Sequence, residues 1–172
     1  MLFRSAEAAQ NVFKKMFQFK GRIRRSEYWW GVLVLTICAI VLSLIPFIGK
    51  IAILFLYIAE TSMLFRRLHD TGRSGWWWGC QFCLGFVSLI FFATAIDFHA
   101  YMQAVAENNS TEIIKVISDG LTGTSGVLGL IFYLVASILG LVLFAFTLLD
   151  SKPEANKYGD SPKYVAENVA EE

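Results

Sequence analysis

Four long apolar stretches divide the chain, and charged or turn-forming residues bound each of them. A helix needs about 20 mainly apolar residues to cross the hydrocarbon core of a bilayer. The first, third and fourth stretches have this length. The second is shorter, but Lys50 and Arg66 at its ends can extend to the interfaces. We therefore predict an all-α membrane protein, a bundle of four transmembrane helices. The spans cover about residues 28–48, 51–65, 76–96 and 127–149.

The connection between the first two spans is short. It covers residues 46–50, and a proline followed by a glycine interrupts a helix there. An unbroken helix from Tyr28 to Phe65 would be nearly twice the thickness of the membrane. We therefore predict a tight helical hairpin.

The connection between the third and fourth spans, residues 97–126, is predicted to lie outside the membrane. Two sets of apolar residues at helical spacing favour one or two short amphipathic helices in it. They are Phe98, Tyr101 and Val105, and then Ile113, Ile114 and Ile117.

One face of the fourth span permits close approach of another helix, because it contains small residues. This face could form a helix–helix interface within the molecule, which we call a seam, or an interface with a second copy. It comprises Gly129, Tyr133, Ala136 and Gly140.

The composition agrees with a membrane-embedded chain. Hydrophobic residues make up 56% of the 172 residues, and the mean hydropathy is +0.54. A soluble domain of this size would need more charged surface. We predict a single integral membrane domain over residues 1–163, followed by a mobile cytoplasmic tail over residues 164–172.

Basic residues are distributed unevenly about the predicted spans. Of the fifteen Lys and Arg residues, only Lys50 and Lys115 fall on one side, and the other thirteen share the opposite side. Positive residues accumulate on the cytoplasmic side of membrane proteins, so both termini are predicted to be cytoplasmic. The thirteen are Arg4, Lys14, Lys15, Lys20, Arg22, Arg24, Arg25, Arg66, Arg67, Arg73, Lys152, Lys157 and Lys163.

The N-terminal residues lack the apolar core and cleavage site of a signal peptide. Apolar side chains recur there at helical spacing, with basic residues elsewhere on the turn. This pattern favours an amphipathic helix lying on the inner membrane surface, and the alternative is a solvated leader. The apolar residues are Phe3, Ala6, Ala9, Phe13, Met16 and Phe17.

The most polar short stretch is the loop expected over residues 66–75. Its arginines and glycines could bind a lipid phosphate or another anion, and the alternative is a topogenic loop with Asp70 paired to an arginine. His69 and Asp70 could also suggest a metal site or the acid–base pair of a lipid-modifying enzyme. This is the interpretation we favour least, because a metal needs three or four ligands and His99 is predicted to lie across the membrane. We predict no metal site, no cofactor and no catalytic residue.

Glu60 is the only carboxylate inside a predicted span. Ionisable residues in the membrane are costly and are functional candidates by default. One interpretation is a proton or ion path. The other, which we favour, is a protonated or helix-bonded packing residue, because few polar residues accompany it along the spans.

Three motifs outside the spans resemble a bacterial inner-membrane family catalogued as domain of unknown function 805. The motifs are FKGRIRRSEYWW over residues 19–30, RRLHDTGRSGWW over residues 66–77 and NKYGDSP over residues 156–162. The resemblance covers about residues 13–163. It implies a bacterial inner-membrane protein and implies no activity.

All three motifs fall on the predicted cytoplasmic side, so we expect them to pack together as one polar cap. Polar groups near the interface are costly to desolvate unless they pair, and glycines supply the turns that such packing needs. The candidate residues are Arg22, Arg25, Glu27, Arg66, Arg67, His69, Asp70, Arg73, Asn156 and Tyr158.

Two functions are consistent with these patterns. The first is a non-enzymatic structural or regulatory membrane protein that binds anionic lipid, a partner protein or a second copy through the cap. The alternative is a small oligomeric transporter or proton-coupled carrier that uses Glu60. Nucleic acid is not an expected partner.

Overall fold

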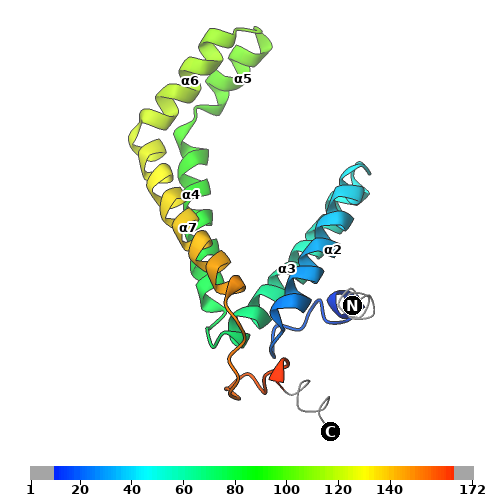
Figure 1. Ribbon diagram of the computed structural model, residues 1–172. Helices are drawn as coiled ribbons and strands as arrows, with labels where there is room; N and C mark the ends of the chain where they lie inside the picture. Colours follow the sequence, from blue (N-terminus) through cyan, green and yellow to red (C-terminus); the bar gives the residue numbers. More distant parts are fainter. Residues whose placement is uncertain (1–9, 165–172) are drawn as a thin grey trace. The chain divides into compact units, whose positions relative to one another are not determined.

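The computed structural model describes residues 10–164, and this part of the chain is built from helices (Figure 1). Four of them, α2, α3, α4 and α7, are long and apolar enough to cross a membrane, which confirms the predicted all-α architecture with four potential spans. Within residues 10–164 there is no strand, only an isolated bridge between Asn156 and Gly159. The helices are α2 (Arg25–Ser43), α3 (Ile48–Asp70), α4 (Trp76–Ala95), α5 (Phe98–Ala106), α6 (Ser110–Thr122) and α7 (Thr124–Leu148).

The chain divides into two compact units. The first joins the segment that ends at Gly75 to the segment that begins at Phe144, and the second is Trp76–Leu143. The last turn of α7 therefore belongs to the first unit. The single membrane domain expected over residues 1–163 stays a prediction.

In the first unit, α2 and α3 form the predicted hairpin around a small apolar core (Figure 1). The helices approach closely at Gly31, where a Cβ atom would lie 2.5 Å from Met63 Cε and 2.9 Å from Val12 Cγ2. An added Cβ atom would therefore require the side chains of Met63 and Val12 to shift. The buried residues of the core are Val12, Ile23, Tyr28, Leu35, Ala59 and Met63.

Helix α3 is longer at its C-terminal end than the predicted span 51–65. Residues 66–70 are its last turn, so placing them in a loop was wrong. The helix ends in a Schellman motif, in which Gly72 N–H donates to His69 O (3.0 Å) and Arg73 N–H donates to Leu68 O (2.8 Å). Gly72 has φ +78°, which a glycine adopts without steric cost.

The predicted interfacial helix lies partly outside the described residues, including its positions Phe3, Ala6 and Ala9. Residues 10–14 are helical and residues 15–17 form a turn. Within this segment Val12 is buried in the core, whereas Phe13 and Phe17 are exposed. The interfacial location stays a prediction.

Of the tail expected at residues 164–172, all but Tyr164 also lies outside the described residues.

In the second unit, α4 and α7 pack along the small-residue face of α7. Ser88 Oγ donates to Gly129 O (2.9 Å), and a Cβ atom at Gly140 would lie 2.6 Å from Gln81 Nε2. These positions therefore form a seam within the molecule, while Tyr133 on the same predicted face is exposed. Beyond α4, α5 and α6 are the short helices expected in the connecting segment.

The close packing of the hairpin between α2 and α3 can be tested by a substitution at Gly49. A Cβ atom at Gly49 would overlap the backbone carbonyl of Leu42, which cannot move without shifting α2. We expect Gly49→Ala to lower the stability by about 1–3 kcal/mol, as overpacking does. Thermal unfolding in detergent, followed by circular dichroism, measures the change.

The matched control is Gly85→Ala on α4, where nothing lies within 4 Å of the added atom. It should leave the stability unchanged or raise it slightly, because alanine favours the helix. Equal melting temperatures for the two variants would show that the turn does not require glycine.

Candidate functional site: a polar cap around Asp70

Three segments of the first unit meet at the C-terminal end of α3. They are residues 21–23, residues 67–70 and residues 147–159, and we call this assembly the polar cap. Asp70 lies at its centre and is fully buried. Because the segments are far apart in sequence, the contacts of this one side chain connect both chain ends to α3.

The Asp70 carboxylate accepts three hydrogen bonds. Its Oδ1 accepts from Arg22 Nε (3.0 Å), and its Oδ2 accepts from Arg67 Nη1 (2.5 Å) and from Ser151 Oγ (2.6 Å). The backbone carbonyl of Asp70 also accepts from Lys152 N–H (3.3 Å). Charge-assisted bonds to both oxygens fix the orientation of the carboxylate.

Arg22 uses all of its donor capacity inside the cap. Besides Nε, its Nη1 donates to Glu154 O (2.8 Å) and Gly159 O (3.2 Å), and its Nη2 donates to Asp70 O (3.3 Å) and Lys152 O (2.5 Å). A guanidinium has five N–H groups, so this set leaves none for a ligand. The side chain is 1% exposed.

Arg67 is fully buried and closes the end of α7. Its Nε donates to Thr147 O (3.2 Å), its Nη2 donates to Leu149 O, and its Nη1 reaches both Ile23 O (3.4 Å) and Asp70. Carbonyls at a helix C-terminus have no partner within the helix, and a cation there also complements the helix dipole.

The buried charges of the cap do not cancel. Two guanidinium groups face one carboxylate, and burying an unpaired charge is costly. The excess positive charge is accommodated by backbone carbonyls, which present the negative end of their dipoles to Arg22 and Arg67. The cap is therefore a self-contained network rather than an open anion site.

His69 and the tail motif form a second layer of the cap. The ring of His69 stacks on Tyr158 with centroids 3.6 Å apart and planes 6° apart, and His69 Nδ1 donates to Gly21 O (3.2 Å). Asn156 Nδ2 donates to His69 O (3.0 Å), and Asn156 Oδ1 accepts from Tyr158 N–H (2.8 Å). Among the described residues no group of three or more His, Cys, Asp or Glu side chains could hold a metal ion.

Four of the predicted residues lie outside the centre of the cap. Arg25 Nη1 donates to Leu148 O (3.2 Å), and Arg73 lies over the ring of Phe146 at 3.8 Å from its centroid. Arg66 is buried with its Nη2 unbonded, and Glu27 accepts a hydrogen bond from Asn11 (3.2 Å). Within residues 10–164 the ion-pair partners of Asp70 are Arg22 and Arg67, and none of these four residues is among them.

Sequence reasoning missed Ser151 and the carbonyl acceptors. Ser151 is a polar residue directly after the fourth span, on the side predicted for the cap, and this position was a usable signal. The carbonyls of Lys152, Glu154 and Gly159 carried no signal, because every residue has the same backbone acceptor.

A surface ion pair lies beyond the cap, where Lys163 Nζ donates to Asp150 Oδ2 (2.6 Å). This bond and a second from Ser151 N–H lower the pKa of Asp150 below its ordinary value. Because the folded-state pKa is depressed, the contribution of the pair is present above the ordinary pKa and is lost as the pH falls through the lowered one.

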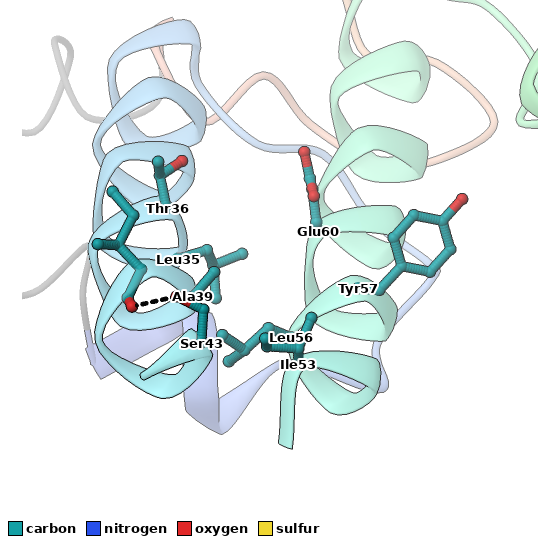
Figure 2. Close-up of a pocket in the computed structure, with 9 residues that line it drawn as sticks. Leu35, Thr36, Ala39, Ser43, Ile53, Leu56, Tyr57 and Glu60 are labelled. Carbon is teal, nitrogen blue, oxygen red and sulfur yellow. Dashed lines mark hydrogen bonds between the residues drawn. The ribbon is translucent and has the colours of Figure 1, made fainter. Parts of the chain in front are cut away.

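Glu60 lies apart from the cap, seven residues before Arg67 on α3. It lines a pocket between α2 and α3, together with Thr36, Ser43 and Tyr57 (Figure 2). The structure therefore separates the predicted candidates into two places, the cap and this pocket.

The sequence profile of the family described as a protein of unknown function (DUF805) matches residues 16–160. The chain belongs to this family. The match includes all three cap segments, from Arg22 through Asp70 to Tyr158.

Two relatives from Escherichia coli strain K12 are similar to part of the chain. The inner membrane protein YhaI is 33% identical over 96 residues, covering 49% of this chain and 80% of YhaI. The inner membrane protein YhaH is 36% identical over 78 residues, covering 38% of this chain and 64% of YhaH. No solved structure matches the chain significantly.

The contribution of the polar cap to stability can be tested by a substitution at Asp70. Asp70→Asn keeps the side-chain shape but leaves Arg22 and Arg67 buried without a countercharge. Breaking a buried ion pair costs about 3–5 kcal/mol, so we expect a large fall in thermal stability in detergent. Circular dichroism during heating, with dispersity checked by size exclusion, measures it.

Asp160→Asn is the matched control, because Asp160 lies in the same tail and is exposed. It should change the stability by no more than about 0.5 kcal/mol. Equal small effects of the two substitutions would mean that the network around Asp70 contributes little to folding.

Proposed function

We propose that the protein is a structural or regulatory component of the bacterial inner membrane that binds anionic lipid headgroups through the basic surface around the polar cap. The membrane location rests on four helices with the length and hydropathy of spans and on relatives described as inner membrane proteins. The proposal of lipid binding rests on the positive charge of the surface around the cap.

The observation that carries the proposal is a set of exposed cations beside a cap that is already saturated. Arg22 and Arg67 donate their hydrogen bonds to acceptors inside the cap, so their guanidinium groups are not available to bind a lipid headgroup. Exposed basic residues on the cap-side segments leave this face cationic, although Asp150, Glu154 and Asp160 also lie on it. The exposed set comprises Lys14, Lys15, Lys20, Arg25, Lys152 and Lys157.

The folded tail brings two more cations close to the C-terminal end of α3. Lys152 Nζ lies beside Gly72, where an added Cβ atom would be 2.9 Å away, and Lys157 Nζ lies 5.0 Å from the ring centroid of Tyr158. The tail therefore adds two positive charges to the surface of the cap. Each basic residue near an anionic leaflet contributes about 1 kcal/mol to binding.

Lipid binding can be measured by native mass spectrometry of the full chain with phosphatidylglycerol and with phosphatidylcholine. We expect preferential retention of phosphatidylglycerol. The triple variant Lys20→Gln, Lys152→Gln, Lys157→Gln should retain it at least about tenfold more weakly, from about 1 kcal/mol per charge.

The matched control is the double variant Lys50→Gln, Lys115→Gln, which removes basic residues predicted on the other side of the membrane. It should retain phosphatidylglycerol as the unmodified protein does. Equal retention by the triple variant would contradict the proposal, and a co-purified protein lost only in the triple variant would favour a protein partner instead.

The orientation is a further part of the proposal, because anionic headgroups and positive residues meet at the cytoplasmic leaflet. Reporter fusions after Lys50, after Asn108 and at the C-terminus test it. We expect the first two to report the periplasm and the third to report the cytoplasm. A periplasmic C-terminus would contradict four spans with both ends inside.

A further inference from the structure

The pocket between α2 and α3 is separate from the cap and lies wholly within the first unit. It has a volume of about 440 Å³ and is walled largely by aliphatic side chains, among them Leu35, Ile53 and Leu56. Figure 2 shows Thr36 and Ser43 on α2 and Glu60 on α3. The volume falls in the range of about 300–1,000 Å³ that is common for small-molecule sites.

The polar groups of the pocket are acceptors. Thr36 Oγ1 donates its proton to Val32 O (2.8 Å), and Ser43 Oγ donates to Ile40 O (2.6 Å; dashed in Figure 2). Both hydroxyl oxygens keep lone pairs but have no proton left for a ligand. In the same view the Tyr57 hydroxyl points away from α2.

Glu60 adds a carboxyl group to this acceptor set. Among residues 10–164 no side chain forms an ion pair or hydrogen bond with its carboxylate, and no Lys, Arg or His lines the pocket. At 1.5 Å per residue, Arg67 is about 10 Å further along α3, and Lys50 is about 15 Å away in the other direction. The carboxylate therefore has no built-in countercharge.

We propose that this pocket binds a protonated amphiphilic amine. The ammonium group donates hydrogen bonds to Glu60 and to the oxygens of α2, and the apolar part occupies the aliphatic wall. An anion would meet a carboxylate and no donor, and a neutral apolar molecule would leave Glu60 unpaired in an apolar setting. This site does not depend on lipid binding at the cap.

The probe is 4-phenylbutylamine, which is cationic at neutral pH, and its uncharged counterpart is 4-phenylbutanol. The full chain is placed in nanodiscs of phosphatidylcholine, which carry no net charge, and binding is measured by calorimetry against empty nanodiscs. We expect saturable binding of the amine and at least tenfold weaker binding of the alcohol, since a charge-assisted bond is lost.

Glu60→Gln should weaken amine binding at least tenfold while leaving alcohol binding unchanged. Ala39→Leu, which fills the pocket from α2, should weaken both ligands. The matched control is Glu107→Gln, at the exposed end of α5, which should bind both ligands as the unmodified protein does.

Equal binding of amine and alcohol, or unchanged amine binding in Glu60→Gln, would overturn the proposal. Absence of saturable amine binding in the folded protein would overturn it too, because the pocket would then be filled by another part of the chain or by a second copy. Circular dichroism of each variant confirms that a loss of binding is not a loss of fold.

Discussion

The first unit depends on one buried carboxylate. Asp70 holds two guanidinium groups and a serine hydroxyl: Arg22 comes from the segment before α2, Arg67 from α3 itself and Ser151 from the segment after α7. A buried ion pair adds little net stability compared with apolar packing, but it is intolerant of a missing partner. In the observed arrangement the three segments together satisfy the carboxylate, so loss of any one partner leaves a buried charged group unpaired. This explains why Arg22 and Arg67 are unsuited to binding an external anion, although sequence alone presents them as candidates.

Helix α3 carries two carboxylates in opposite situations. Asp70 accepts three hydrogen bonds and is fully buried, whereas Glu60 has no countercharge among the residues lining its pocket. The difference follows from where the arginines are, since Arg67 lies one turn from Asp70 and two turns from Glu60. The first carboxylate is used to hold the fold. The second retains its capacity to interact with something outside the described chain, which is why it is the better candidate for ligand chemistry.

Hydrophobic patterning predicted the helices well, because burial in lipid depends on side-chain composition over many residues. It placed the end of α3 too early, because four of the residues 66–70 are polar or charged, yet the turn is buried by partners distant in sequence. Gly72 was the readable signal for the true end, since helices often stop at such a glycine. The backbone contacts of Arg22 could not be predicted. Four of its five acceptors are backbone carbonyls, and their placement depends on the folded tail and not on residue identity.

The excess positive charge in the cap has a consequence for the tail. Carbonyls of Lys152, Glu154 and Gly159 surround Arg22, so this part of the tail takes the place of water around a buried guanidinium. If the tail left α3, Arg22 would lose three acceptors and would have to be rehydrated, while His69 would lose its stacking partner Tyr158. Release of the tail is therefore coupled to the rearrangement of Asp70 and of the end of α7.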